Sequence, residues 1–174
     1  MSADVMIRRL RPDDANSFRA IRLEALTVNP EAFGSTLELE DKLDVPWFAS
    51  RLENSHVMGA FRDDELVGTA GFAVQQGQKH AHKGRLWGMY VRPSSRNIGV
   101  GRLLVSAVLD VAREKVELIQ LTVVRDNRPA RRLYESVGFV EFGMEPKASK
   151  LGEKYYDEAH MALDFSQSGR ISEA

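Results

Sequence analysis

Cysteine is absent from the chain, so disulfides and catalysis through a thiol nucleophile are excluded. An excess of charge of either sign is also lacking, because the 174 residues carry a formal net charge of −1. A dedicated nucleic-acid-binding protein is usually basic, so we expect no nucleic-acid partner. No apolar run reaches membrane-spanning length and no signal peptide is recognisable. We therefore expect a cytoplasmic protein with no membrane partner.

Internal repeats and low-complexity blocks are lacking as well, which disfavours solenoid and disordered architectures. A chain of 174 residues is long enough to bury a substantial core in one domain. We expect this single domain over residues 1–165, followed by a polar C-terminal tail at 166–174.

The most informative stretch lies in the middle of the chain. An apolar segment of strand length, Leu86–Val91, is followed by Pro93, which has no N–H to continue a β-ladder. Beyond a short loop, apolar residues recur at helical spacing: Leu104, Ala107, Val108 and Val111. The pattern predicts a strand, a tight loop and a helix.

The loop itself has features of a phosphate site. Gly99 and Gly101 have no Cβ, so the backbone can turn tightly and a ligand can approach it closely. The first N–H groups of a helix have no partners within the helix and attract anions. Arg96 and Arg102 add positive charge beside them.

Two nucleotide-binding motifs fit this loop poorly. Arg102-Leu103 stands where a Walker loop needs Lys followed by Ser or Thr. Leu104 replaces the third glycine of a dinucleotide fingerprint, although Asp126 near the end of the next strand favours a Rossmann-type nucleotide binder. A plain glycine turn between packed elements is a further alternative.

The sequence Arg96-x-x-Gly99-x-Gly101, after the strand end Val91-x-Pro93, resembles the acetyl-CoA loop of the GNAT N-acetyltransferases. A second motif of that family resembles a segment further along the chain: Asn127-x-x-Ala130-x-x-Leu133-Tyr134-x-x-x-Gly138-Phe139. The two motifs stand in the family's order, and the resemblance covers roughly residues 85–143.

Hydrophobic periodicity and turn residues predict the remaining elements. Strands are expected at 5–10, 57–61, 66–74, 85–91, 118–124, 139–144 and 155–163, with a loop at 146–152. Helices are expected from about 13 to 28, at 46–52, from the glycine loop to 115, and at 127–137. The second helix would hold Trp47, Phe48 and Leu52 against the core.

This order predicts an α/β protein. The resemblance implies a mixed, mostly antiparallel central sheet with helices on both faces. In that arrangement the strands at 85–91 and 118–124 are parallel and splay apart at one end. Gly88 is the expected place for the bulge that opens the wedge between them.

The resemblance implies acetyl-CoA (coenzyme A) as the acetyl donor. The pyrophosphate would meet the N–H groups of 98–101, and the pantetheine arm would pair with the backbone of 89–91. The expected cofactor-binding residues are Met89, Tyr90, Val91, Arg96, Asn97, Ile98, Gly99, Val100, Gly101, Arg102, Asn127, Ala130 and Tyr134. No metal is expected, because His80 and His82 lack a third ligand.

Two catalytic roles follow from the resemblance. A tyrosine at the position of Tyr134 serves as general acid for the departing thiolate, although on its helix alone Tyr134 would be a core residue. The backbone N–H of Met89 is the expected oxyanion donor. The general base is open between Glu24, Glu31, Asp157, Glu158 and a water chain, because the splayed strands carry no carboxylate.

The acidic stretch at 31–45 is either a solvated face or a lid over a cationic acceptor. Candidate acceptor contacts are Glu24, Glu31, Trp87 and Tyr156. The expected function is acetyl-CoA-dependent N-acetyltransfer to a primary amine. Transfer would be direct, because the chain has neither Cys nor a Gly-x-Ser-x-Gly elbow.

Several alternatives stay open at this point. The acceptor could be a small molecule, or a peptide amine such as a protein N-terminus or lysine side chain. A non-catalytic acyl-CoA sensor would share the fold, and the protein could be a monomer or a homodimer.

Overall fold

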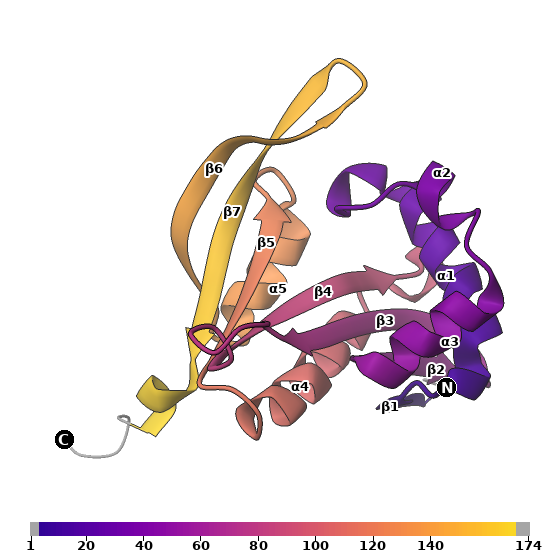
Figure 1. Cartoon of the computed structure of the whole chain (residues 1–174), viewed down its shortest axis with the longest axis horizontal. Coiled ribbons are helices and arrows are strands. Elements are labelled where there is room, and N and C mark those ends of the chain that lie inside the picture. The colour runs from indigo at the N-terminus through magenta and orange to yellow at the C-terminus, as the bar shows by residue number, and fades with distance from the viewer. Residues whose placement is uncertain (1–3, 170–174) are drawn as a thin grey trace.

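A seven-stranded sheet organises the protein (Figure 1). The computed structural model describes residues 4–169. The strand order is β1-β2-β3-β4-β5-β7-β6, and every neighbouring pair is antiparallel except β4 and β5. The strands are β1 (Val5–Arg9), β2 (His56–Arg62), β3 (Glu65–Val74), β4 (Lys83–Val91), β5 (Leu118–Val124), β6 (Val140–Leu151) and β7 (Lys154–Asp164). The predicted mixed, mostly antiparallel sheet is confirmed.

Helices cover both faces of this sheet, as predicted (Figure 1). Helices α1 (Ala15–Val28) and α3 (Val45–Asn54) pack on one face, together with the buried side chains of Val57, Phe61 and Leu66. Helix α4 (Val100–Arg113) and helix α5 (Arg128–Ser136) cover the other face. Shorter elements are α2 (Leu37–Glu40) and the 3-10 turns η1 (Pro12–Asp14), η2 (Pro30–Ala32), η3 (Pro93–Ser95) and η4 (Phe165–Gly169). No described helix is long and apolar enough to cross a membrane.

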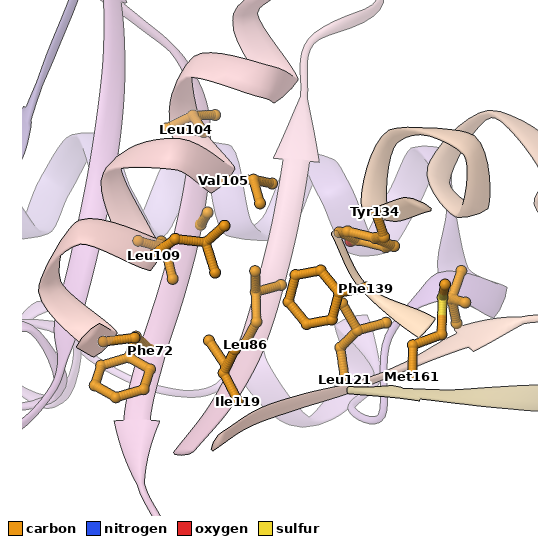
Figure 2. Packing of buried hydrophobic residues seen from close by; sticks show 14 of the residues in the cluster. Phe72, Leu86, Leu104, Val105, Leu109, Ile119, Leu121, Tyr134, Phe139 and Met161 are labelled. Carbon is orange, nitrogen blue, oxygen red and sulfur yellow. The ribbon is translucent and has the colours of Figure 1, made fainter. Parts of the chain in front are cut away.

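The larger core lies beneath α4 and α5. An apolar stripe at helical spacing on α4 faces the sheet, as an amphipathic helix requires. Figure 2 shows this packing, in which α4 side chains meet residues from β3, β4, β5 and β7. The fully or nearly fully buried members include Phe72, Leu86, Leu104, Val105, Leu109, Ile119, Leu121 and Met161.

The parallel pair separates after three residues. Lys83, Gly84 and Arg85 pair with Leu118, Ile119 and Gln120, and no further β4–β5 pair occurs in the described chain. Strand β5 instead pairs with β7 along its whole length. The two strands therefore splay, as the resemblance implied, and the space between them is open for a ligand.

A bulge sits on β4 where the strands diverge. Thr69 pairs with Tyr90 and Gly71 with Trp87, so Gly88 and Met89 together oppose one residue of β3. Gly88 has φ of +62°, a left-handed conformation that favours glycine. The predicted bulge is confirmed. It shifts the alternation of β4, because Trp87 and Tyr90 both pack on the α1 face.

Two local predictions were wrong. Trp47 remains 37% exposed because it sits at the edge of α3 and lines a surface pocket, whereas Phe48 and Leu52 are buried as expected. The expected loop at 146–152 is strand as far as Leu151, with the register shift between Glu145 and Ser149. Pro146 predicted a loop there, but a proline is tolerated where the pairing register of a strand is irregular.

The C-terminal prediction is partly testable. Residues 166–169 of the expected polar tail belong to the 3-10 turn η4, and Ser166 donates its backbone N–H and its hydroxyl to Asp164. The remainder of the expected tail, 170–174, lies outside the described residues.

Candidate active site

The glycine loop connects the end of β4 to the N-terminus of α4. Asn97 and Gly99 have φ of +63° and +88°, and Gly99 is the N-cap of α4. The Leu103 N–H donates to the Gly99 carbonyl at 3.1 Å. The N–H groups before Leu103 therefore have no carbonyl within the helix and face the loop, where an anion would find them.

Arg96 fixes this loop in place. Its Nε donates to the Val91 carbonyl at 2.8 Å, and its Nη2 donates to Asn29 Oδ1 at 2.9 Å. Its guanidinium also lies 5.6 Å from the centre of the Tyr90 ring. Arg96 thus ties the loop to the end of β4 and to the end of α1, with its charge beside the α4 N-terminus.

A groove of about 410 Å³ runs beside this loop. It brings together eleven of the thirteen predicted cofactor residues: Met89, Tyr90, Val91, Arg96, Asn97, Gly99, Val100, Gly101, Asn127, Ala130 and Tyr134. Ile98 and Arg102 do not line it, and Ile98 is 55% exposed. The remaining lining comes mainly from the end of α1, from η2 and from α5.

Tyr134 lies where the groove meets the wedge between β4 and β5. Its ring is buried against Phe139, edge to face at a centroid distance of 5.8 Å (Figure 2). Its hydroxyl has no hydrogen-bond partner within the described residues, and burial raises the pKa of Tyr134 above its usual value. The ring therefore belongs to the core, as the helix pattern predicted, and the residue also lines the cleft and the groove. Its role as general acid stays a prediction.

Asn127 sets the position of Tyr134. Its Oδ1 accepts the Ala130 N–H at 3.3 Å and so caps α5. Tyr134 follows on the same helix, and both residues line the cleft between the splayed strands. That cleft is small, about 100 Å³, and its walls also include Gly88, Met89 and Thr122.

A second pocket of about 520 Å³ opens on the α1 side of the sheet. It shares Leu86, Trp87, Gly88 and Thr122 with the cleft, which in turn shares Met89 and Tyr134 with the groove beside the glycine loop. The three spaces therefore adjoin one another. They lead from the N-terminus of α4, past Tyr134, to a chamber beneath α2 and α3.

The predicted acceptor contacts are only partly brought together. Trp87 lines the second pocket, whereas Glu24, Glu31 and Tyr156 line neither the pocket nor the cleft. Glu24 accepts the Tyr90 hydroxyl and Arg92 Nε, each at 3.0 Å. Burial and this contact with Glu24 raise the pKa of Tyr90 to about 12.

The other candidate bases also lie away from the cleft. Asp157 accepts Arg125 Nη1 and the Lys147 N–H, each at 2.9 Å. Glu158 sits on β7 opposite Val124 and does not line the cleft. None of the four carboxylates is therefore placed beside Tyr134.

Three of the five acids in the stretch 31–45 make structural contacts. Glu40 forms two 2.8 Å hydrogen bonds with Arg22, and Asp41 pairs with Arg19 at 3.4 Å. Asp44 caps α3 by accepting the Trp47 N–H at 3.0 Å. These acids attach the segment around α2 to α1 and begin α3, which gives the three of them a structural role; a cationic acceptor stays a prediction.

Sequence reasoning missed the charged lining of this pocket: Arg22, Glu40, Arg51 and Arg85. One signal was available, because Arg19 and Arg22 stand one turn apart on α1 and face the acids of the following segment. Arg51 and Arg85 come from α3 and β4, and nothing local marks either as a pocket residue. No cluster of three or more metal-ligating side chains occurs in the described part of the chain.

Comparison with known proteins identifies this architecture. The family model for the acetyltransferase (GNAT) family matches residues 17–139. The chain belongs to the GNAT family. The predicted family resemblance is confirmed, and the GNAT match includes the glycine loop, the splayed strands and α5.

Curated relatives include two named acetyltransferases. The chain is 33% identical over 156 residues to the mycothiol acetyltransferase of Acidothermus cellulolyticus, covering 82% of this chain and 46% of that protein. It is 26% identical over 164 residues to the L-amino acid N-acetyltransferase AaaT of Escherichia coli, covering 92% and 98%. The chain thus spans about half the length of the mycothiol enzyme and nearly all of AaaT.

Solved structures share the GNAT fold. A GNAT-family acetyltransferase from Streptococcus pneumoniae superposes with a TM-score of 0.84 at 23% identity, covering 92% of this chain and 99% of that one. The Salmonella typhimurium protein yncA, a putative acetyltransferase solved with its cofactor acetyl-CoA, gives a TM-score of 0.80 at 21% identity, covering 93% and 94%. At these identities the likeness establishes the fold.

Proposed function

We propose that this protein is an acetyl-CoA-dependent N-acetyltransferase that moves an acetyl group directly to the primary amine of a small molecule. We further propose that residues 1–165 act as one catalytic domain. The observation that carries the proposal is the run of three adjoining spaces from the α4 N-terminus, past Tyr134, to the second pocket. The names of the relatives, an amino-acid and a mycothiol acetyltransferase, support a small acceptor.

The groove beside the glycine loop would take the polar end of coenzyme A. Unpaired N–H groups at the start of α4 and the anchored guanidinium of Arg96 would bind the pyrophosphate. A Cβ on Gly101 would lie 3.1 Å from Leu133 Cδ2 and 3.2 Å from Met89 Cε, so the chain is close-packed beside the groove. Acetyl-CoA, when bound, supplies an activated acetyl group as a thioester.

The divergence of β4 from β5 leaves backbone groups of β4 available to bind the cofactor. Beyond Arg85 the β5 side of β4 has no strand partner, so the polar backbone of 89–91 is available to the pantetheine amides. The Met89 N–H would donate to the oxyanion that develops on the acetyl carbonyl. The bulge at Gly88 and Met89 aims this part of the backbone into the cleft.

Tyr134 Oη would hold the proton for the leaving sulfur. Burial keeps the hydroxyl protonated by raising its pKa, and the absence of a competing acceptor among the described residues leaves it free to donate. The buried ring contact with Phe139 fixes its direction. We propose that the residue is catalytic on these grounds.

The amine must lose a proton before it attacks. The carboxylate on the pocket wall, Glu40, is already bound by Arg22, and the other candidate acids lie outside the cleft. A water chain through the second pocket is therefore our proposed route for the proton. An acyl-enzyme on a thiol is excluded because the chain has no cysteine, and we propose direct transfer to the amine.

A Rossmann-type nucleotide binder is disfavoured, because the sheet has a single parallel pair instead of a parallel core. Thermal shift with acetyl-CoA, CoA and NAD tests the donor site, and stabilisation is expected from the first two alone. Release of CoA thiol with small amines, but not with peptides bearing free N-termini or lysines, is the expected turnover. Binding without any amine-dependent turnover would instead identify a sensor.

A further inference from the structure

The charges around the second pocket are unbalanced. Three arginines and one glutamate line it, and the arginines come from three different elements. Arg22 and Glu40 neutralise each other through two hydrogen bonds of 2.8 Å, with side chains only 11% and 8% exposed. Arg51 and Arg85 remain as two cations without a carboxylate.

Arg51 is held in the pocket by aromatic rings. Its guanidinium carbon lies 4.3 Å from the centre of the Trp87 ring and 5.4 Å from that of Trp47. Within the described residues it makes no ion pair. Burial and repulsion from Arg22 lower the pKa of Arg51, which Glu40 only partly offsets. The nearest carboxylate, Glu40, is bound by Arg22 and makes no ion pair with Arg51, so the positive charge of Arg51 is left available to a ligand.

Arg85 stands where the two strands begin to diverge. It is the last β4 residue that pairs with β5, and its Nη2 donates to Thr122 Oγ1 at 3.1 Å. Thr122 lines both the cleft and the second pocket. Arg85 therefore places positive charge next to the route that an amine would take toward Tyr134, and it too has no carboxylate partner in the described chain.

We infer that the amine acceptor carries a carboxylate, and that Arg51 and Arg85 bind this carboxylate while its amine faces the cleft. The inference rests on the proposed N-acetyltransferase function and names its substrate class. A planar guanidinium binds a carboxylate through two parallel hydrogen bonds, and two such groups bind it from two sides. The apolar walls, which include Phe33, Leu39, Leu43 and Trp87, suit an acceptor with an apolar body.

The acceptor of this inference is therefore an amino-acid-like molecule: a primary amine, a nearby carboxylate and an apolar side chain. The test compares L-leucine, L-methionine and L-phenylalanine with their three carboxamides, which keep the amine and side chain but lose the negative charge. We expect kcat/KM to be at least about tenfold higher for the acids, the effect of losing a charge-assisted hydrogen bond. The carboxamide amine is less basic, so amine basicity alone would favour the opposite order.

Variants of the two arginines test whether the preference for acids over carboxamides arises in this pocket. Arg51→Gln and Arg85→Gln should each reduce the acid-to-amide ratio about tenfold or more, mainly through KM of the acid, with acetyl-CoA affinity unchanged. Arg51→Lys should retain part of the acid-to-amide ratio that Arg51→Gln loses, because lysine keeps the positive charge but cannot make two parallel hydrogen bonds to a carboxylate. The matched control is Arg113→Gln, which removes an arginine stacked on Phe165 at 5.5 Å, far from the pocket, and should leave the ratio unchanged.

A binding measurement separates this inference from the proposed function. N-acetyl-L-phenylalanine should bind the protein in the presence of CoA, and both Arg→Gln variants should weaken it at least about tenfold. Such binding without turnover of any amine would support the carboxylate site and refute the N-acetyltransferase. Carboxamides acetylated as well as the acids, an unchanged ratio in both variants, or neither binding nor turnover of the acids would overturn the inference.

Discussion

Replacing Tyr134 by Phe tests the proposed proton donor with little change to the core. The ring is 5% exposed and packs edge to face on Phe139, and phenylalanine preserves that contact. Because the hydroxyl has no partner in the described chain, its loss should change the free energy of unfolding by less than about 1 kcal/mol. Acetyl-CoA affinity should likewise stay within about twofold.

The expected effect of Tyr134→Phe is on kcat. A general acid contributes about 10²–10⁴-fold, and a thiol with a pKa near ~8.5 leaves more easily than an alcohol, so we expect a loss of about 10- to 1,000-fold. This corresponds to about 1.4–4 kcal/mol of activation free energy. Steady-state release of CoA thiol measures it, with Tyr155→Phe as control, since Tyr155 is 49% exposed on β7.

The pH profile adds a second readout. Burial raises the pKa of Tyr134, so the donor should stay protonated and kcat should not fall on its account up to about pH 10. Normal turnover in Tyr134→Phe with normal stability would refute the role of the hydroxyl. Normal turnover with lost stability would make Tyr134 a structural residue only.

Three further perturbations are predicted. Gly101→Asp should weaken acetyl-CoA binding more than tenfold by calorimetry, because a Cβ there meets Leu133 at 3.1 Å and the new carboxylate repels phosphate; unchanged affinity in a folded variant would contradict the placement. Asn127→Ala should cost about 1 kcal/mol in chemical denaturation by removing the α5 cap, and no loss would exclude that cap. Glu40→Gln should cost about 3 kcal/mol by leaving Arg22 buried without its partner. Burial opposes ionisation of Glu40, but the contacts with Arg22 outweigh burial and lower the pKa of Glu40. The stability that this ion pair adds to the fold should therefore be present above about pH 4.5 and be lost below it. If Glu40→Gln leaves the free energy of unfolding unchanged at neutral pH, the stabilising role of the pair is refuted.

The order of strands and helices was predictable because local signals mark each element. Pro93 follows the end of β4, Gly99 is the N-cap of α4, and Asn127 is the N-cap of α5. The hairpin of β6 and β7 was harder, because Pro146 usually ends a strand and is here absorbed by an irregular register. The local sequence shows that proline disfavours a strand, but it does not show the pairing register with β7 that accommodates Pro146.

The groove beside the glycine loop was largely predictable, since most of its residues fall in the two motifs and the strand before the first; Asn29, Ala32 and Phe33 were not predicted. The second pocket was not. Arg51 and Arg85 lie on α3 and β4 and line one pocket only because the fold brings Trp87 of β4 against Arg51 of α3. The acids of 31–45 were easy to see, but the arginines of α1 that pair with Asp41 and Glu40 were not, so the sequence left the role of these acids open.

The most direct test of the account counts products in one reaction. Purified protein is incubated with acetyl-CoA and L-phenylalanine or L-methionine, and free CoA thiol and the acetylated amine are quantified together by mass spectrometry. The account predicts one N-acetylated acceptor for each thiol released, with neither formed when the amine is omitted. Thiol release without an acetylated amine, or acetyl-CoA binding with no amine-dependent release from any primary amine, would contradict it.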